Sequence, residues 1–129
     1  MMNEAPTEMT GLHVTLDRLV YRRIDPEESE GKRHGFVYFL SIHNDADVAV
    51  TIKGRKWVVS HDDGTQLVLE GDGVVGKTPT ILPGEKFSYN SWHALPTSKG
   101  VATGAFIGLD QDGRRVFVRI PEFRMKAPR

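Results

Sequence analysis

The sequence predicts an all-β protein folded as an antiparallel sandwich of about seven strands. Short apolar stretches recur along the 129 residues, and clusters of Gly, Asp, Asn and Pro, which favour turns, separate them. No stretch has apolar residues at helical spacing, whereas parallel strands would need helical crossovers between them. A small closed barrel is the alternative architecture.

The first two strands are expected at residues 12–24 and 36–44. Leu12–Ile24 is rich in β-forming residues and has Val14 and Leu16 on one face. Phe36–Asn44 has apolar residues on both faces, as in a strand that is covered on both sides or lies near the centre of a sheet. The charged segment between them, Asp25–Gly35, is expected to be an exposed loop.

A change of phase marks the third strand. Val50 and Ile52 alternate with polar residues, but after Gly54 the apolar positions shift by one residue, to Trp57 and Val59. Because such a slip turns side chains to the opposite face, Gly54 is expected to lie at a β-bulge or at a bend between sheets.

Two Asp-Gly pairs, at residues 63–64 and 112–113, are flanked by apolar stretches and predict β-hairpins. The remaining strands are expected at residues 65–70, 85–92, 101–109 and 115–120. Seven short strands within roughly 100 residues are typical of immunoglobulin and fibronectin type III sandwiches.

The composition argues against nucleic acid or a membrane as a partner and favours a cytoplasmic protein. Seventeen basic and seventeen acidic residues cancel, so the chain lacks the basic charge of a nucleic-acid-binding protein. No apolar stretch approaches the roughly 20 residues of a membrane span. The absence of cysteine fits a reducing compartment, and we expect a cytoplasmic protein. Residues 1–10 are expected to form a disordered tail without signal-peptide features, and residues 11–126 a single domain.

The segment EGDGVVGK has the spacing Gly71-x-Gly73-x-x-Gly76 of a dinucleotide-binding loop. In such a loop the last glycine opens a helix, whose N-terminus binds the pyrophosphate. Pro79 and Pro83 lack N–H donors, and each disfavours a helix in the residue before it. We therefore expect no helix after Gly76, which excludes the Rossmann interpretation.

Two interpretations of this loop remain. Glycine-rich backbone forms concave nests of N–H groups that bind anions without a helix. In that case Gly71, Gly73, Gly76 and Lys77 form a site for phosphate or pyrophosphate, with Lys77 adding a positive charge. Alternatively, the glycines adopt backbone angles closed to other residues, so that a long loop can cross between the sheets.

The two tryptophans suggest different roles. Trp57 follows Arg55 on the same strand face and is expected to pack in the core, while Arg55 stacks on it or pairs with an acid. Trp92 is out of phase with the inward-facing Tyr89 and lies beside His93, just before a loop. Trp92 and His93 are therefore candidate protein-interaction residues. Packing of Trp92 beneath the loop is the alternative.

No catalytic or metal-binding residues are expected. The five histidines form no H-x-H or H-E-x-x-H pair, and HDDG and DQDG lack the further oxygen ligands of a calcium loop. There is no cysteine, and no serine lies in a G-x-S-x-G elbow. We expect neither enzymatic activity nor a cofactor.

Four segments resemble the ApaG family. GDGVVGKTPTILPGEKFSYNS is similar to the family pattern G-x-G-V-V-G-x-x-P-x-L-x-P-G-E-x-F-x-Y-x-S, and FVYFLSIHN is similar to F-x-Y-x-I-x-I-x-N. GRKWVVSHDDG resembles S-R-x-W-x-I-x-D-x-x-G at Arg55, Trp57 and Gly64, and VRIPEFRM resembles the closing V-x-I-P-x-F-x-L. The resemblance extends from about Leu12 to Met125.

This resemblance implies a fibronectin type III-like sandwich and a stand-alone bacterial protein. Similar domains at the end of some F-box proteins and of a polymerase-interacting protein imply a protein-interaction module. The bacterial family is associated with cobalt resistance and magnesium efflux, and no catalytic residues are established for it. The pyrophosphate site proposed for its glycine loop carries over to Gly71, Gly73 and Gly76. The segment SWHALPTSKG departs from the family pattern near Trp92. The resemblance therefore does not carry over to a partner surface formed by this loop.

The sequence thus predicts a non-enzymatic module, monomeric or homodimeric, that binds another protein. The alternative is the binding of a phosphate-containing small molecule, such as a dinucleoside polyphosphate, through the segment Gly71–Gly76. Neither nucleic acid nor a membrane is expected as a partner.

Overall fold

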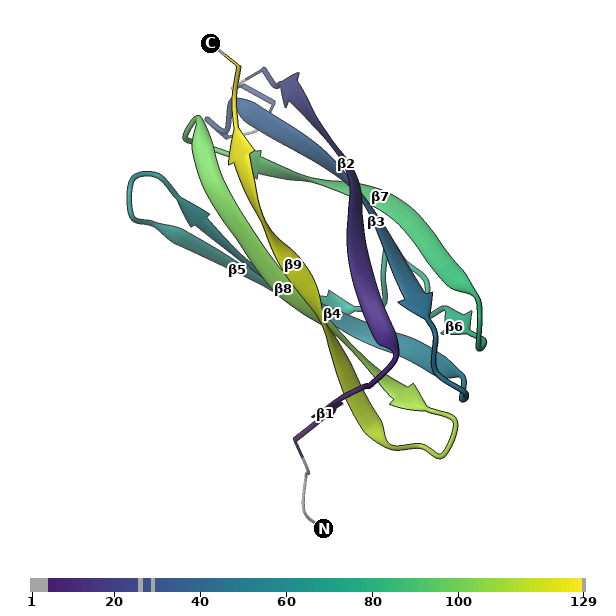
Figure 1. Cartoon of the computed structure of the whole chain (residues 1–129). Helices are drawn as coiled ribbons and strands as arrows, with labels where there is room; N and C mark the ends of the chain where they lie inside the picture. Colours follow the sequence, from purple (N-terminus) through teal and green to yellow (C-terminus); the bar gives the residue numbers. More distant parts are fainter. Residues whose placement is uncertain (1–4, 26, 29, 129) are drawn as a thin grey trace.

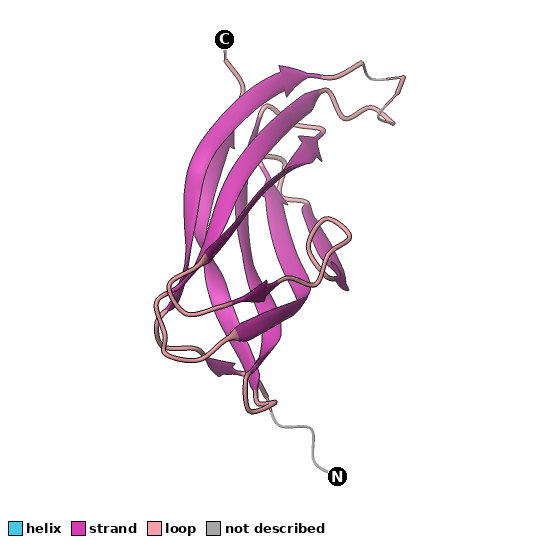
Figure 2. Cartoon of the chain, turned by 90° about the vertical axis from the view of Figure 1, so that its right-hand side faces the viewer, coloured by secondary structure: helices cyan, strands magenta, loops and turns pink. Residues whose placement is uncertain are grey.

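The computed structural model describes residues 5–25, 27–28 and 30–128. Over these residues the chain forms nine β-strands and no helix, arranged as two sheets that pack face to face (Figure 1, Figure 2). The antiparallel β-sandwich expected from the sequence is confirmed.

Seven strands are long and two are short. The long strands are β2 (Leu12–Arg23), β3 (His34–Asn44), β4 (Val50–His61), β5 (Gln66–Asp72), β7 (Lys86–Leu95), β8 (Lys99–Asp110) and β9 (Arg115–Lys126). The short strands are β1 (Thr7–Glu8) and β6 (Thr80–Ile81). One sheet has the order β1-β9-β8-β4-β5, with β6 also paired to β4, and the other has the order β2-β3-β7. All pairs are antiparallel except β1 with β9.

The seven long strands correspond to the seven expected ones, and the two short strands were not expected. One of them lies in the segment 1–10, for which the sequence predicts a disordered tail. Residues 1–4 lie outside the described residues, but Thr7 and Glu8 pair with β9, and Met9 is buried in the core. Ordered structure therefore begins before the predicted boundary at residue 10.

The predicted change of phase in β4 is a β-bulge. The register between β4 and β8 shifts between Ile52 and Gly54, and both strands stay in the same sheet across it. Val50 and Ile52 before the bulge, and Trp57 and Val59 after it, all face the core and are buried. The bulge thus keeps the apolar residues of one long strand on the inner face despite their slip in sequence.

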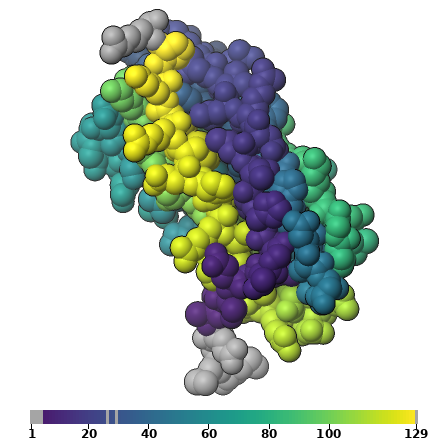
Figure 3. All heavy atoms as spheres, in the orientation of Figure 1, coloured from purple at the N-terminus to yellow at the C-terminus, as the bar shows by residue number. Residues whose placement is uncertain are grey.

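The two open sides of the sandwich differ. On one side β2 packs against β9, and Figure 3 shows the C-terminal strand running beside the N-terminal segment. On the other side lie the edge strands β5 and β7, which stand further apart. The β4–β5 hairpin projects from the body of the molecule at the left of Figure 1. Among the described residues, no helix is long and apolar enough to cross a membrane.

Candidate functional site

The glycine-rich segment after β5 forms a tight hairpin. Val74 and Lys77 exchange two backbone hydrogen bonds, of 2.7 and 3.0 Å. Between them Val75 and Gly76 both have positive φ angles, 45° and 79°, as in a type I′ turn. The chain then continues into β6 rather than into a helix. The prediction that no helix follows Gly76 is confirmed.

Arg55 of β4 holds the start of this hairpin. Its Nη1 atom donates to the carbonyl oxygens of Asp72, at 2.8 Å, and Gly73, at 3.1 Å. A Cβ atom at Gly71 would lie 2.8 Å from the same Nη1, so glycine at this position leaves room for the guanidinium. The expectation that Arg55 stacks on Trp57 or pairs with an acid is wrong, because backbone carbonyls are its partners.

Several N–H groups of the glycine loop already have acceptors. The N–H of Gly73 donates to the carbonyl of Lys53 at 2.7 Å, and those of Val74 and Lys77 are used within the hairpin. At the tip of the hairpin, the N–H group of Gly76 has no backbone acceptor among the described residues and is free to bind an anion. Anion binding by this loop stays a prediction, and the tip of the hairpin still offers an N–H donor for it.

Trp92 and His93 lie on opposite faces of β7. The side chain of Trp92 points outward and is 57% exposed, so it does not pack beneath the following loop. His93 points inward and is only 5% exposed. The two predicted interaction residues therefore contribute differently, one as an exposed aromatic surface and the other as a buried ring.

An apolar cavity of about 190 Å³ lies between the edges of the two sheets. Leu67 and Leu69 of β5 are directly opposite Val59 and Trp57 of β4, so they share the face that points to the core. Leu69 is nevertheless 41% exposed, because β5 extends beyond the smaller three-stranded sheet. The cavity is lined by Lys32, Val59, Leu67, Leu69, Trp92, His93 and Ala94.

His93 is the buried polar group at this cavity. Its ring packs among Tyr38, Trp57 and Phe123, with ring centroids 4.7, 4.7 and 6.4 Å away. Burial lowers the pKa of His93 to about 4, so the ring is neutral at pH 7. Its Nε2 atom is buried and has no hydrogen-bond partner among the described residues. The Nε1 atom of Trp57 is likewise buried and without a partner among the described residues. Because buried polar atoms are rarely left unpaired, we expect a water molecule or a bound partner to supply the missing hydrogen bonds.

The apolar surface continues around β7 onto the outer face of the three-stranded sheet. Trp92 is directly opposite Val37, and Val37 is directly opposite Val20. These three side chains form one row across the sheet, and both valines are partly exposed. Together with Leu67 and Leu69, they form what we call the β5–β7 edge surface.

Sequence reasoning identified Trp92 and His93 but not the two leucines of this surface. Leu67 and Leu69 occur in QLVLE, where their spacing of two residues predicts one apolar strand face. That spacing normally indicates burial. It carries no information on whether the opposite sheet is wide enough to cover the strand, and here it is not.

The described residues contain no group of three or more His, Cys, Asp or Glu side chains that could hold a metal ion. The five histidines do not gather at one place. His13 and His43 stack at 4.6 Å, whereas His34 bonds to the hydroxyl of Tyr21 at 2.7 Å and His61 to that of Thr65 at 2.9 Å.

Comparisons with known proteins agree on one group of relatives. A family model described as the ApaG domain matches residues 25–109. The chain is 37% identical over 99 residues to Protein ApaG of Vibrio cholerae, covering 77% of this chain and 79% of that protein. It is 35% identical over 105 residues to Protein ApaG of Nitrosomonas europaea, covering 81% and 83%. The crystal structure of a Bordetella pertussis protein described as ApaA superimposes with a TM-score of 0.82 at 28% identity, covering 96% and 99%.

Proposed function

Since this chain belongs to the ApaG family, we propose that it is a non-enzymatic binding module and that its β5–β7 edge surface recognises another protein. The observation that carries the proposal is the position of Leu69. Its side chain is on the core-facing side of its sheet and yet is 41% exposed, next to an exposed tryptophan. Uncovered apolar surface of this kind marks interaction sites.

The partner that fits this surface is an extended protein segment with apolar side chains. β5 is the last strand of its sheet among the described residues, so one row of its N–H and C=O groups can pair with an added strand. The cavity beside it, at about 190 Å³, can take an apolar side chain of the partner, since a cavity of roughly 150 Å³ holds benzene. Trp92 at the rim supplies the aromatic anchor typical of binding hot spots.

His93 could add a hydrogen bond to this recognition. Its unpaired Nε2 atom lies at a site otherwise lined mainly by apolar side chains. Because this nitrogen has almost no exposed surface, a hydroxyl or an amide of the partner would reach it only if the side chains that cover it move apart on binding. Binding would then remove an unpaired buried atom whose cost is about 1–3 kcal/mol.

A catalytic role for the cavity has less support. Over the described residues, its lining contains no hydroxyl, thiol or carboxylate side chain to act as a nucleophile or a paired acid and base. The family's association with cobalt resistance and magnesium efflux is then an indirect effect, exerted through the partner. That partner is expected to be another cytoplasmic protein.

Quantitative affinity capture from the host cell tests this proposal. Bait proteins would be the wild type, Trp92→Ala, Leu69→Ala and the control Leu82→Ala. Leu82 is 50% exposed but lies after β6, outside the edge surface. We expect at least one protein that is retained by the wild type and by Leu82→Ala and lost with both edge variants. Equal capture by all four baits, or capture by none, contradicts the proposal.

A further inference from the structure

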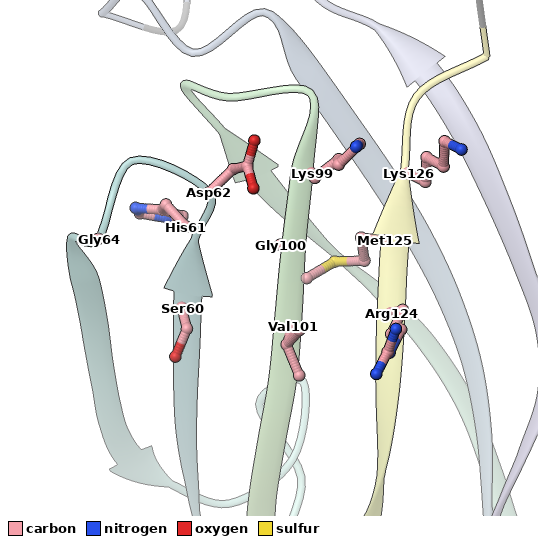
Figure 4. Close-up of a pocket in the computed structure, with 10 residues that line it drawn as sticks. All are labelled: Ser60, His61, Asp62, Gly64, Lys99, Gly100, Val101, Arg124, Met125 and Lys126. Atoms are coloured by element: carbon pink, nitrogen blue, oxygen red, sulfur yellow. The ribbon is translucent and has the colours of Figure 1, made fainter.

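A second cavity, of about 510 Å³, lies on the outer face of the six-stranded sheet and shares no lining residue with the cavity at the β5–β7 edge surface. Figure 4 shows the residues that line it. It is formed where β4, β8 and β9 run side by side near the C-terminal end of β9. Its most prominent side chains are those of Lys99, Arg124 and Lys126. The recognition of an apolar segment by the β5–β7 edge surface does not use the side chains that line this cavity.

Strand register places the three cations on one face. Lys99 is directly opposite Lys126, and Val101, two residues further along β8, is directly opposite Arg124. Ser60 of β4 is opposite Val101 on its other side. Because directly paired residues and residues two apart along a strand share a face, all five side chains project toward the same side of the sheet.

No described acidic residue forms an ion pair with a cation of this cluster. Two lysines directly opposite each other in a sheet repel. Neighbouring cations on the same sheet have acidic partners: Lys56 lies 3.4 Å from Glu70, and Arg119 lies 3.5 Å from Glu8. Lys99, Arg124 and Lys126 form no ion pair with any described residue.

The rest of the lining indicates what kind of anion fits. Asp62 is the one acidic side chain among the described residues around the cavity, so three cations face a single carboxylate. Val101 contributes apolar surface, and Ser60 contributes a hydroxyl. A cavity of a few hundred Å³ with mixed apolar and charged lining is typical of a small-molecule site.

We propose that this cavity binds a small organic anion with two or more negative charges, borne by phosphate or carboxylate groups. The planar guanidinium of Arg124 can donate two parallel, bidentate hydrogen bonds to such an oxyanion. Lys99 and Lys126 act as point charges on either side, and the bound anion relieves their mutual repulsion. The apolar surface of Val101 receives the body of the ligand.

Titration at low ionic strength tests the proposal, because salt screens exposed charges. Inorganic pyrophosphate and citrate are the two probes, and they separate a phosphate source from a carboxylate source. We expect at least one of them to shift the backbone amide signals of Lys99, Val101 and Arg124. Arg124→Gln and Lys99→Gln should each weaken that binding about tenfold.

The matched control is Lys86→Gln, which removes one positive charge from β7 in the other sheet. It should leave the affinity within about twofold, since Lys86 is not among the residues around this cavity. The proposal is overturned if neither anion moves these amide signals, or if Lys86→Gln weakens binding as much as Arg124→Gln. Shifts confined to the amides of Gly71, Gly73 and Gly76 would also overturn it and would place the anion at that loop. These outcomes are independent of protein capture by the β5–β7 edge surface.

Discussion

The ring of His93 meets the indole of Trp57 edge to face, with 4.7 Å between the ring centroids and 80° between the planes. This contact joins the two sheets, since His93 is in β7 and Trp57 is in β4. It also keeps the imidazole out of water, and this burial should make the free energy of unfolding depend on pH.

The free energy of unfolding should depend on pH through His93. In the unfolded chain His93 has a pKa of about 6.5, whereas burial in the folded chain lowers the pKa of His93 to about 4. The unfolded state therefore holds more protons in this window, and stability should fall as the pH decreases from 6.5 to 4, by up to roughly 3 kcal/mol. Urea unfolding at a series of pH values measures this slope.

His93→Phe supplies the comparison for that experiment, because phenylalanine keeps an aromatic ring beside Tyr38 and Phe123 but does not titrate. The difference in unfolding free energy between the two proteins should change with pH only below about 6.5. A difference that is constant from pH 7 to pH 4 would show that His93 is not buried as a neutral ring.

Val75→Asn should stabilise the protein by about 1 kcal/mol. Val75 has a φ of 45°, a conformation in which a β-branched residue is strained, at a cost of roughly 1–3 kcal/mol. Asn followed by Gly is the preferred pair for a type I′ turn. The measurement is the urea midpoint at unchanged m-value. Val68→Asn on the exposed face of β5 serves as control and should not stabilise, because valine suits a strand. A midpoint for Val75→Asn at or below that of the wild type counts against the strained turn.

Gly73 and Gly76 should respond differently to alanine. Both have positive φ angles, which cost alanine about 1 kcal/mol. A Cβ atom at Gly73 would in addition lie 2.4 Å from the carbonyl oxygen of Lys77, whereas one at Gly76 would meet nothing within 4 Å. Gly73→Ala should therefore cost at least about 1 kcal/mol more than Gly76→Ala in thermal or urea unfolding. Equal costs would mean that the hairpin is not closed as described.

Much of the fold was predictable because it depends on local patterns. The slip of apolar residues around Gly54 indicated a bulge, and the structure has one. The Asp-Gly pairs indicated hairpin turns, and Gly64 and Gly113 have the positive φ angles that such turns need. The two-residue strands β1 and β6 are too short for any periodicity, and their pairing depends on strands distant in sequence.

The candidate sites were predictable only in part, because they depend on what lies across from a strand. The phase of Trp92 against its neighbours indicated an outward side chain. The exposure of Leu69 depends on the number of strands in the opposite sheet, and the partners of Arg55 depend on how the chain turns after β5. Lys99 and Lys126 are 27 positions apart in the sequence, and only the register of β8 with β9 brings them together.

Hydrogen exchange on the complex with a captured partner tests the proposed protein recognition most directly. If an extended segment adds to the edge of β5, amides within Gln66–Asp72 should exchange more slowly in the complex, together with those around Trp92. The hairpin at residues 110–115, at a distance from this edge, should exchange at the same rate with and without the partner. Slower exchange confined to other strands, with β5 unchanged, would contradict recognition through the β5–β7 edge surface.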